Sequence, residues 1–312
     1  MDKRRFRQGG TGFGEKSQEL VLKTLVYSDL FDYPLTGEEI KKNLISSRQI
    51  SKKILKKAIN SLVEKKLIGK KDNLYYLQGR KKVVALRKEK KPFSKKKMIL
   101  LHKVAASFKK IPWVRAVVAT GGLSRENARA EDDIDLLIIT SNKRLWLTRC
   151  LIIALLELKG KRRRPGGKVV KDKFCLNVFL DQGHLVLPKN KRSLFTAYEV
   201  LQTKLVWQRE NAYQQFICSN QWTKGYLFNA FQAKFIKELP SEDEEPFFER
   251  RIGDSLEKLF YLLQKNYMKS RQTNEKVSRG QAFFHPQDSE KWVLERYRRR
   301  WVSLLDTHLG SG

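Results

Sequence analysis

The strongest constraint in the sequence is a segment in which one apolar stretch ends in two glycines and a second opens with Asp-Ile-Asp. The first stretch, residues 116–120, predicts a strand that leads into Gly121 and Gly122, and the second predicts another strand. Because side chains alternate faces along a strand, we expect Asp133 and Asp135 to point the same way. Two adjacent carboxylates form a hard oxygen site, which suits Mg²⁺ bound together with substrate phosphates.

The glycine turn is a candidate phosphate site. Residues without a Cβ let backbone amides approach a phosphate closely. Gly121, Gly122, Ser124 and Arg125 are therefore candidates to bind a triphosphate, and the guanidinium of Arg125 would neutralise charge on its oxygens.

This segment resembles the signature of the polymerase β nucleotidyltransferase superfamily, whose small bacterial members often show Gly-Ser-x-Ala-Arg-Gly, a spacer and Ser-Asp-Ile-Asp-Leu. Laid on this chain without a gap, the Gly-Ser pair falls on Gly121 and Gly122, the Arg on Arg125, and the acidic pair on the two aspartates. The resemblance covers about residues 98–187. It implies a Mg²⁺ (or Mn²⁺) cofactor and transfer of a nucleoside monophosphate from a nucleoside triphosphate to an acceptor.

Three of the departures from this signature bear on the chemistry. Ser124 replaces the usual Ala, and Glu126 replaces the usual Gly. The family's third carboxylate lies on a later strand, where this chain has Asn177, while Asp181 lies roughly 13 Å further along that strand. An Asn can bind a metal through its carbonyl oxygen, but it cannot take a proton from the attacking hydroxyl. We expect Asn177 to face the two aspartates, with activity that is reduced, restricted to another acceptor, or absent.

Residues 18–80 predict three helices followed by a hairpin. The segment 36–39, Thr-Gly-Glu-Glu, has the pattern of a capping box that opens a helix. A polar turn at 70–73 separates two short apolar stretches that read as strands. Three helices and a basic hairpin resemble a winged helix-turn-helix domain.

The helix expected after Ser51 has a basic face. Its apolar residues share one side, and Lys53, Lys56 and Lys57 fall on the other. On one interpretation these lysines contact the phosphates of DNA or RNA, with the 70–73 turn as a wing. On the other, the face is solvated and the domain only packs against its neighbour. The sequence leaves both open.

The flanking segments complete the expected organisation. Residues 1–17 are basic and Gly-rich and predict a flexible arm, and the charged run 81–97, which contains Pro92, predicts a linker. The pattern over 188–312 is helical. We therefore expect an α+β protein with an N-terminal winged helix-turn-helix, a central nucleotidyltransferase domain with a mixed sheet over 98–187, and a C-terminal helical region.

Charge favours a polyanionic partner. The 312 residues include 65 Lys and Arg against 33 Asp and Glu, which gives a formal net charge of +32. Nucleic acid and nucleoside triphosphates both qualify as partners, and a general compositional bias toward Lys is the alternative. No apolar stretch predicts a signal segment or a membrane span, so we expect a cytoplasmic protein with no membrane partner. The three cysteines, Cys150, Cys175 and Cys218, predict reduced thiols and no zinc site.

Two functions of different classes follow from these patterns. The first is a Mg²⁺-dependent nucleotidyltransferase. The second is a nucleic-acid-binding regulator that keeps a catalytically degenerate transferase domain as a scaffold. The nucleotide, the acceptor and the oligomeric state have no signal in the sequence.

Overall fold

The structure is a computed structural model, and it describes residues 13–164, 166–167, 169–235, 247–269, 276–284 and 289–308. The chain divides into two compact units. The first contains Met1–Lys88, Trp222–Ala233 and Val293–Gly312, and the second contains Glu89–Gln221 and Lys234–Trp292. Among the described residues, none of the helices is both long and apolar enough to cross a membrane.

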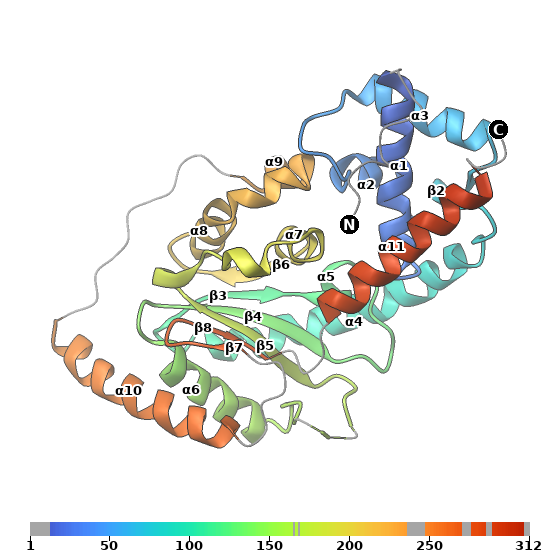
Figure 1. Cartoon of the computed structure of the whole chain (residues 1–312). Helices are drawn as coiled ribbons and strands as arrows, with labels where there is room; N and C mark the ends of the chain where they lie inside the picture. The colour runs from blue at the N-terminus through green and yellow to red at the C-terminus, as the bar shows by residue number, and fades with distance from the viewer. Residues whose placement is uncertain are drawn as a thin grey trace. The chain divides into compact units, whose positions relative to one another are not determined.

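A mixed six-stranded sheet forms the centre of the second unit, as Figure 1 shows. Its strand order is β6-β3-β4-β5-β8-β7, in which β4 and β5 run parallel and every other neighbouring pair is antiparallel. The strands are β3 (Val114–Ala119), β4 (Ile134–Thr140), β5 (Phe174–Asp181), β6 (Lys204–Gln208), β7 (Lys276–Val277) and β8 (Gln281–Phe283). The mixed sheet predicted from the sequence is confirmed.

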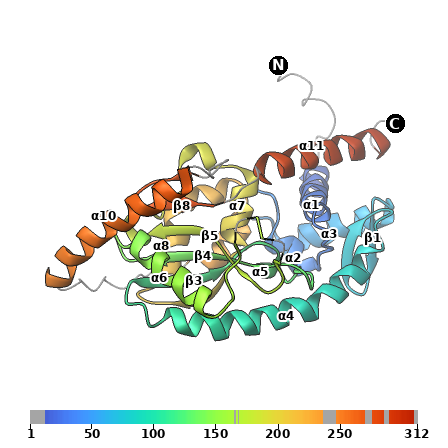
Figure 2. The same ribbon diagram turned by 90° about the horizontal axis from the view of Figure 1, so that it is seen from below.

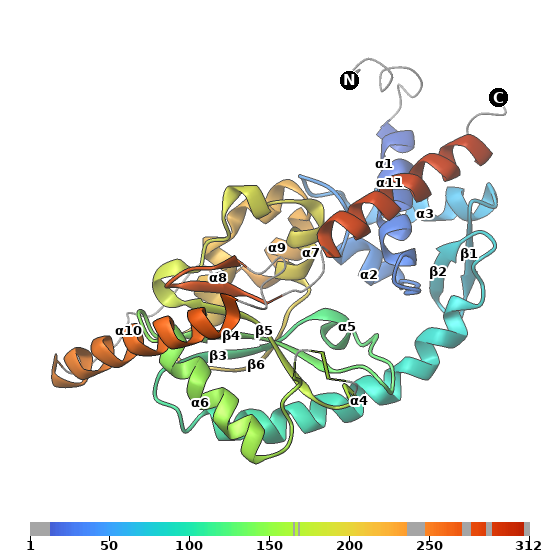
Figure 3. The ribbon, with the colours of Figure 1, turned by 60° about the horizontal axis from the view of Figure 1, so that its bottom comes forward.

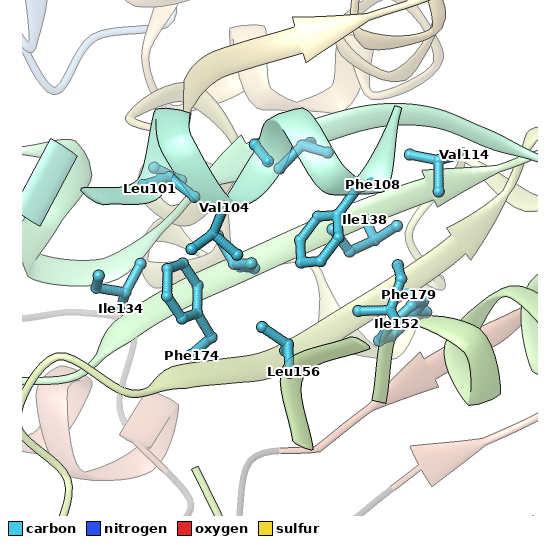
Figure 4. Close-up of a cluster of buried hydrophobic side chains, with 14 of the residues drawn as sticks. Leu101, Val104, Phe108, Val114, Ile134, Ile138, Ile152, Leu156, Phe174 and Phe179 are labelled. Atoms are coloured by element: carbon cyan, nitrogen blue, oxygen red, sulfur yellow. The ribbon is translucent and has the colours of Figure 1, made fainter. Parts of the chain in front are cut away.

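Alternation along β4 directs apolar side chains into a core on one face of the sheet. Ile134 and Ile138 are fully buried there, together with Phe108 and Phe174 (Figure 4). Leu136 is also fully buried in this core. The helix α6 (Leu145–Leu158) packs on this face, and α10 (Phe247–Lys269) packs against α6. The other helical elements of this unit are α5 (Gly121–Ser124), η1 (Gln182–His184), η2 (Lys189–Lys191), α7 (Leu194–Leu201) and α8 (Ala212–Ser219).

The segment expected as a linker is helical, and the boundary between the two units falls within it. Residues 83–108 form one continuous helix, α4 (Val83–Phe108), with Pro92 inside it (Figure 2). A proline inside a helix removes one backbone hydrogen bond and favours a break. Here the helix continues because side chains on both sides of the proline are held by packing. Val83 and Val84 are buried near the helix start, and Leu101 and Phe108 are buried in the sheet core.

The first unit contains the predicted helices and hairpin. These elements are α1 (Phe13–Asp29), α2 (Gly37–Lys42), α3 (Lys52–Glu64), β1 (Ile68–Lys71) and β2 (Leu74–Leu77). The capping box at Thr36 and Glu39 is present. β1 and β2 pair around the two-residue turn Asp72-Asn73, whose φ angles of 52° and 60° give the left-handed conformation of a tight hairpin. The coarse fold of this segment is therefore confirmed.

The ends of the chain differ from the prediction. α1 begins at Phe13, so the arm expected over 1–17 is already helical from there, and residues 1–12 lie outside the described part. The region 188–312 is not purely helical, because it supplies β6, β7 and β8 to the sheet. It also contains η3 (Gln221–Gly225), α9 (Phe228–Lys234) and α11 (Ser289–His308). Trp301 of α11 is buried in the core of the N-terminal unit, and Arg300 pairs with Asp29 at 2.8 Å.

Candidate functional site

Asp133 and Asp135 lie at the start of β4 and share one face. The residue between them, Ile134, is fully buried in the core on the opposite face, so strand alternation fixes both carboxylates on the same side. Ligand atoms of Asp133, Asp135 and Cys175 all lie within 4.8 Å of one another, and this group could hold a metal ion. The structure thus brings together the two aspartates singled out in the sequence and adds a cysteine.

Asn177 belongs to the same cluster. Its side-chain Nδ2 donates a hydrogen bond to Oδ1 of Asp135 at 2.5 Å, and the thiol of Cys175 donates to its Oδ1 at 2.8 Å. The expected direction of the Asn177 side chain therefore agrees with this geometry. A buried amide needs such partners, because an unpaired polar group in an apolar strand is costly.

A register shift between β4 and β5 positions the side chains of Asp135 and Asn177. Asp135 pairs with Cys175 and Leu136 with Leu176, but Leu137 pairs with Val178, so Asn177 is the extra residue on β5. An extra residue locally bends a strand and re-aims its side chains. The sequence pattern did not predict this shift.

Arg163 is the second residue that the sequence interpretation missed. The basic run 161–164 could bind nucleic acid or triphosphate, and a solvated loop is its simpler interpretation. In the structure, Nη1 of Arg163 donates to Oδ2 of Asp133 and lies 3.6 Å from Sγ of Cys175. Four side chains are therefore linked in one network, from Arg163 through Cys175 and Asn177 to Asp135. A run of arginines gives no signal that one of them reaches a carboxylate on a distant strand.

The electrostatics of the cluster raise two pKa values. Burial and the neighbouring Asp133 carboxylate raise the pKa of Asp135 to about 7, against the lowering effect of the Asn177 hydrogen bond. Burial and the same two carboxylates raise the pKa of Cys175 to about 12. Close like charges disfavour ionisation, so the cluster favours the binding of a cation.

The glycine turn packs directly against Asp135. Gly121 begins α5, which lies beside the central strands in Figure 3, and it has a φ of +61°. A Cβ added at Gly121 would lie 2.5 Å from Oδ2 of Asp135, so the turn requires glycine. Gly122 has no comparable contact, since the nearest atom to an added Cβ would be 3.6 Å away. The hydroxyl of Ser124 donates to the carbonyl of Gly121 at 2.9 Å and holds the turn.

Arg125 lies in the same turn but contacts α7. Its Nη1 donates to Oε1 of Gln202 at 3.3 Å and lies 3.9 Å from Oε1 of Glu199. Glu199 also contributes to the raised pKa of Asp135, so it adds negative charge to the surroundings of the site. Glu126, one residue further on, has a φ of 57°, a left-handed conformation that favours glycine.

A buried lysine fixes the loop that carries Asp133. The ammonium of Lys97 donates to the carbonyls of Ala130 and Asp132 at 3.0 and 2.7 Å, and it pairs with Asp172 at 2.7 Å. A Lys ammonium has three N–H donors, and here each has an acceptor. The backbone immediately before Asp133 is thereby held in place.

Two more residues of α4 hold the preceding part of this loop. Lys90 donates to the side chain of Asn127 at 3.0 Å, and the buried hydroxyl of Ser94 accepts the Ala128 N–H at 3.0 Å. Lys90, Ser94 and Lys97 follow the spacing of one helix face, which explains why the helix passes through the predicted linker.

The basic helix face has the predicted pattern in α3. Lys53, Lys56 and Lys57 are exposed, and none of the three forms an ion pair with another described residue. The buried side of α3 consists of Leu55, Ala58, Ile59 and Leu62.

Asp181 lies at the far end of β5. Its carboxylate bonds the His184 ring at 2.7 Å and accepts the Lys143 N–H at 3.2 Å, so it has its own partners. His285 has no nearby Cys or His in the sequence and is expected to be a packed structural residue rather than a ligand; it lies outside the described residues.

Comparisons with protein-family models, with curated proteins and with solved structures gave no significant match to this chain.

Proposed function

We propose that the central domain is a nucleotidyltransferase of the polymerase β type, which moves a nucleoside monophosphate from a nucleoside triphosphate to an acceptor and releases pyrophosphate. The observation that carries this proposal is the pairing of Asp133 and Asp135 on one face of β4 with Gly121 packed against Asp135. It joins the two halves of the sequence resemblance, since the glycine turn and the acidic pair lie in direct contact.

The donor atoms fit a hard divalent cation. Asp133 and Asp135 would hold Mg²⁺ or Mn²⁺, which supplies neutralisation of the phosphate charge and alignment for in-line displacement. Two of the three possible ligands, Asp133 and Asp135, are hard carboxylate oxygens, and this pair carries the preference for Mg²⁺ or Mn²⁺.

The chain's own groups would orient the substrate. The turn from Gly121 to Arg125 borders Asp135, and Arg125 would add positive charge beside the phosphates once it leaves Glu199. Asn177 holds the Asp135 carboxylate and cannot act as a general base. Deprotonation of the acceptor would therefore depend on another group, or on an acceptor that is already ionised.

Isothermal titration with each nucleoside triphosphate, with and without Mg²⁺, tests this function. We expect binding that requires Mg²⁺ and is lost in Asp135→Ala. Glu131→Ala is the matched control, because it removes an exposed carboxylate from the same loop. Binding that is independent of both Mg²⁺ and Asp135 would contradict the proposal.

A second candidate is the nucleic-acid-binding regulator with a degenerate transferase domain. It is supported by Asn177 in place of a third carboxylate and by the exposed lysines of α3. In this case α1 to α3 with the β1–β2 hairpin would act as a winged helix-turn-helix, with Lys53, Lys56 and Lys57 on DNA or RNA phosphates. Nucleic-acid binding without any triphosphate binding would favour this second function.

A further inference from the structure

Arg163 contacts two of the three groups that could share a metal ion. Its Nη1 donates to Asp133 and lies 3.6 Å from Sγ of Cys175. A guanidinium and a divalent cation on the same carboxylate would repel each other at close range. The two cations therefore cannot both bind Asp133 at full strength.

We propose that Arg163 is a built-in cation that competes with the divalent ion for Asp133 and transfers to the nucleotide phosphates when ion and nucleotide bind. This proposal rests on the proposed function. It assigns to Arg163 a regulatory role in metal loading and a phosphate-binding role afterwards. Planar guanidinium groups suit both partners, since they form paired hydrogen bonds with carboxylates and with phosphates.

The exchange needs only a side-chain rotation. The backbone of Arg163 is held at the start of β5, where its N–H donates to the carbonyl of Phe174 at 3.1 Å and the Phe174 N–H donates to Lys161 at 2.7 Å. The Arg163 side chain is 38% exposed, so it borders solvent while it contacts Asp133.

The neighbouring arginines allow the contact of Arg163 with Asp133 to be distinguished from the general positive charge of this loop. Arg162 and Arg164 both pair with Glu157 at 2.9 Å, whereas Arg163 pairs with Asp133. Removing Arg164 deletes the same charge from the same loop and leaves the Asp133 contact intact. Arg164→Gln is therefore a matched control for Arg163→Gln.

Mn²⁺ binding, followed by the electron paramagnetic resonance signal of the free ion, is the first measurement. We expect the Mn²⁺ Kd of Arg163→Gln to be about tenfold lower than that of the wild type, because a charge-assisted hydrogen bond no longer competes with the ion for Asp133. Arg164→Gln should change the Kd by less than about twofold. Arg163→Lys, which keeps a cation, should stay near the wild-type value, and thermal melting checks that each variant folds.

The second measurement is triphosphate binding at saturating Mn²⁺, where Arg163→Gln should bind about tenfold more weakly than the wild type. A purely structural role would not produce opposite changes in the two affinities. An unchanged or weaker Mn²⁺ affinity in Arg163→Gln overturns the competition, and unchanged triphosphate binding overturns the transfer to phosphate.

Asp135→Asn distinguishes failure of this proposal from failure of the proposed function. If wild type and Asp135→Asn bind Mn²⁺ equally, the metal site itself is wrong. If Mn²⁺ binding depends on Asp135 but not on Arg163, the site stands and the competition is refuted.

Discussion

Nδ2 of Asn177 donates a 2.5 Å hydrogen bond to Oδ1 of Asp135, and Cys175 donates to the carbonyl oxygen of the same amide. Asn177 therefore acts as a donor that steadies a carboxylate, at the position where the nucleotidyltransferases that the sequence resembles carry another carboxylate. The amide neutralises no charge, so the repulsion between Asp133 and Asp135 is left for Arg163 or a metal ion to offset.

Replacing Asn177 by Asp should destabilise the metal-free protein and increase its affinity for metal ions. The new carboxylate still accepts from Cys175 but repels Asp135, which should lower the free energy of unfolding by about 1–3 kcal/mol. Mg²⁺ should restore this stability, and nucleotide transfer should rise if the domain is a weakened transferase.

Thermal unfolding with and without Mg²⁺ measures this effect. Asn177→Ala is the control, because it removes the same hydrogen bonds without adding a charge. If the wild-type protein transfers nucleotide efficiently and Asn177→Asp abolishes the transfer, the third-carboxylate argument is wrong.

Gly121→Ala should disrupt the site, whereas Gly122→Ala should not. An alanine Cβ at Gly121 would meet Oδ2 of Asp135 at 2.5 Å, and its φ of +61° adds about 1–2 kcal/mol of backbone strain. At Gly122 the nearest atom would be 3.6 Å away, which is an ordinary contact. Chemical denaturation and Mn²⁺ titration of both variants make the comparison, and equal effects would show that Gly121 has no special contact with Asp135.

The stability of the metal-free protein should fall as the pH rises from about 4 to about 7. The folded pKa of Asp135 is raised from 3.8 to about 7, so in this interval the folded state keeps a proton that the unfolded state has released. The slope should approach about 1.4 kcal/mol per pH unit and level off above pH 7.

Denaturant unfolding in a chelating buffer, compared between wild type and Asp135→Asn, tests this slope. The variant cannot titrate at this position and should lose the slope. In parallel, divalent-ion affinity of the wild type should weaken below pH 7, because the proton competes with the ion. A pH-independent Mn²⁺ Kd between pH 5 and 7 would show that Asp135 is not a ligand.

If α3 binds nucleic acid, Lys53→Ala with Lys56→Ala should weaken binding to all sequences. Fewer counterions are then released, so the slope of log K against log salt should become shallower. The expected change is that for the loss of about two phosphate contacts. Lys95→Ala with Lys96→Ala is the control, since it removes the same charge from an exposed part of α4. Equal affinity and equal salt dependence in both double variants would favour a packing role for α3.

Local patterns predicted much of the fold and the acidic pair. The strand that opens with Asp-Ile-Asp is present as β4, and the capping box at Thr36 is present. Asp133 and Asp135 share a face because their positions differ by two along a strand. Such features depend on the backbone periodicity of neighbouring residues, which the order of residues already contains.

Position 177 combines a feature that the sequence shows with contacts that it does not show. The apolar strand around Asn177 and its departure from the family pattern are visible in the sequence, but its partners are not. The register shift that adds a residue to β5 arises from packing against β4, and only then does Asn177 meet Asp135.

The sequence by itself determined the strand that carries Asp133 and Asp135, the glycine turn before it and the amphipathic α3, since each follows from spacing along a few residues. The tertiary structure alone decided that Arg163 binds Asp133, that Cys175 joins the site, and that Lys97 of α4 binds the loop before Asp133. These contacts join residues far apart in the chain. Their geometry depends on how the sheet and helices close around a shared core, and no local periodicity encodes that closure.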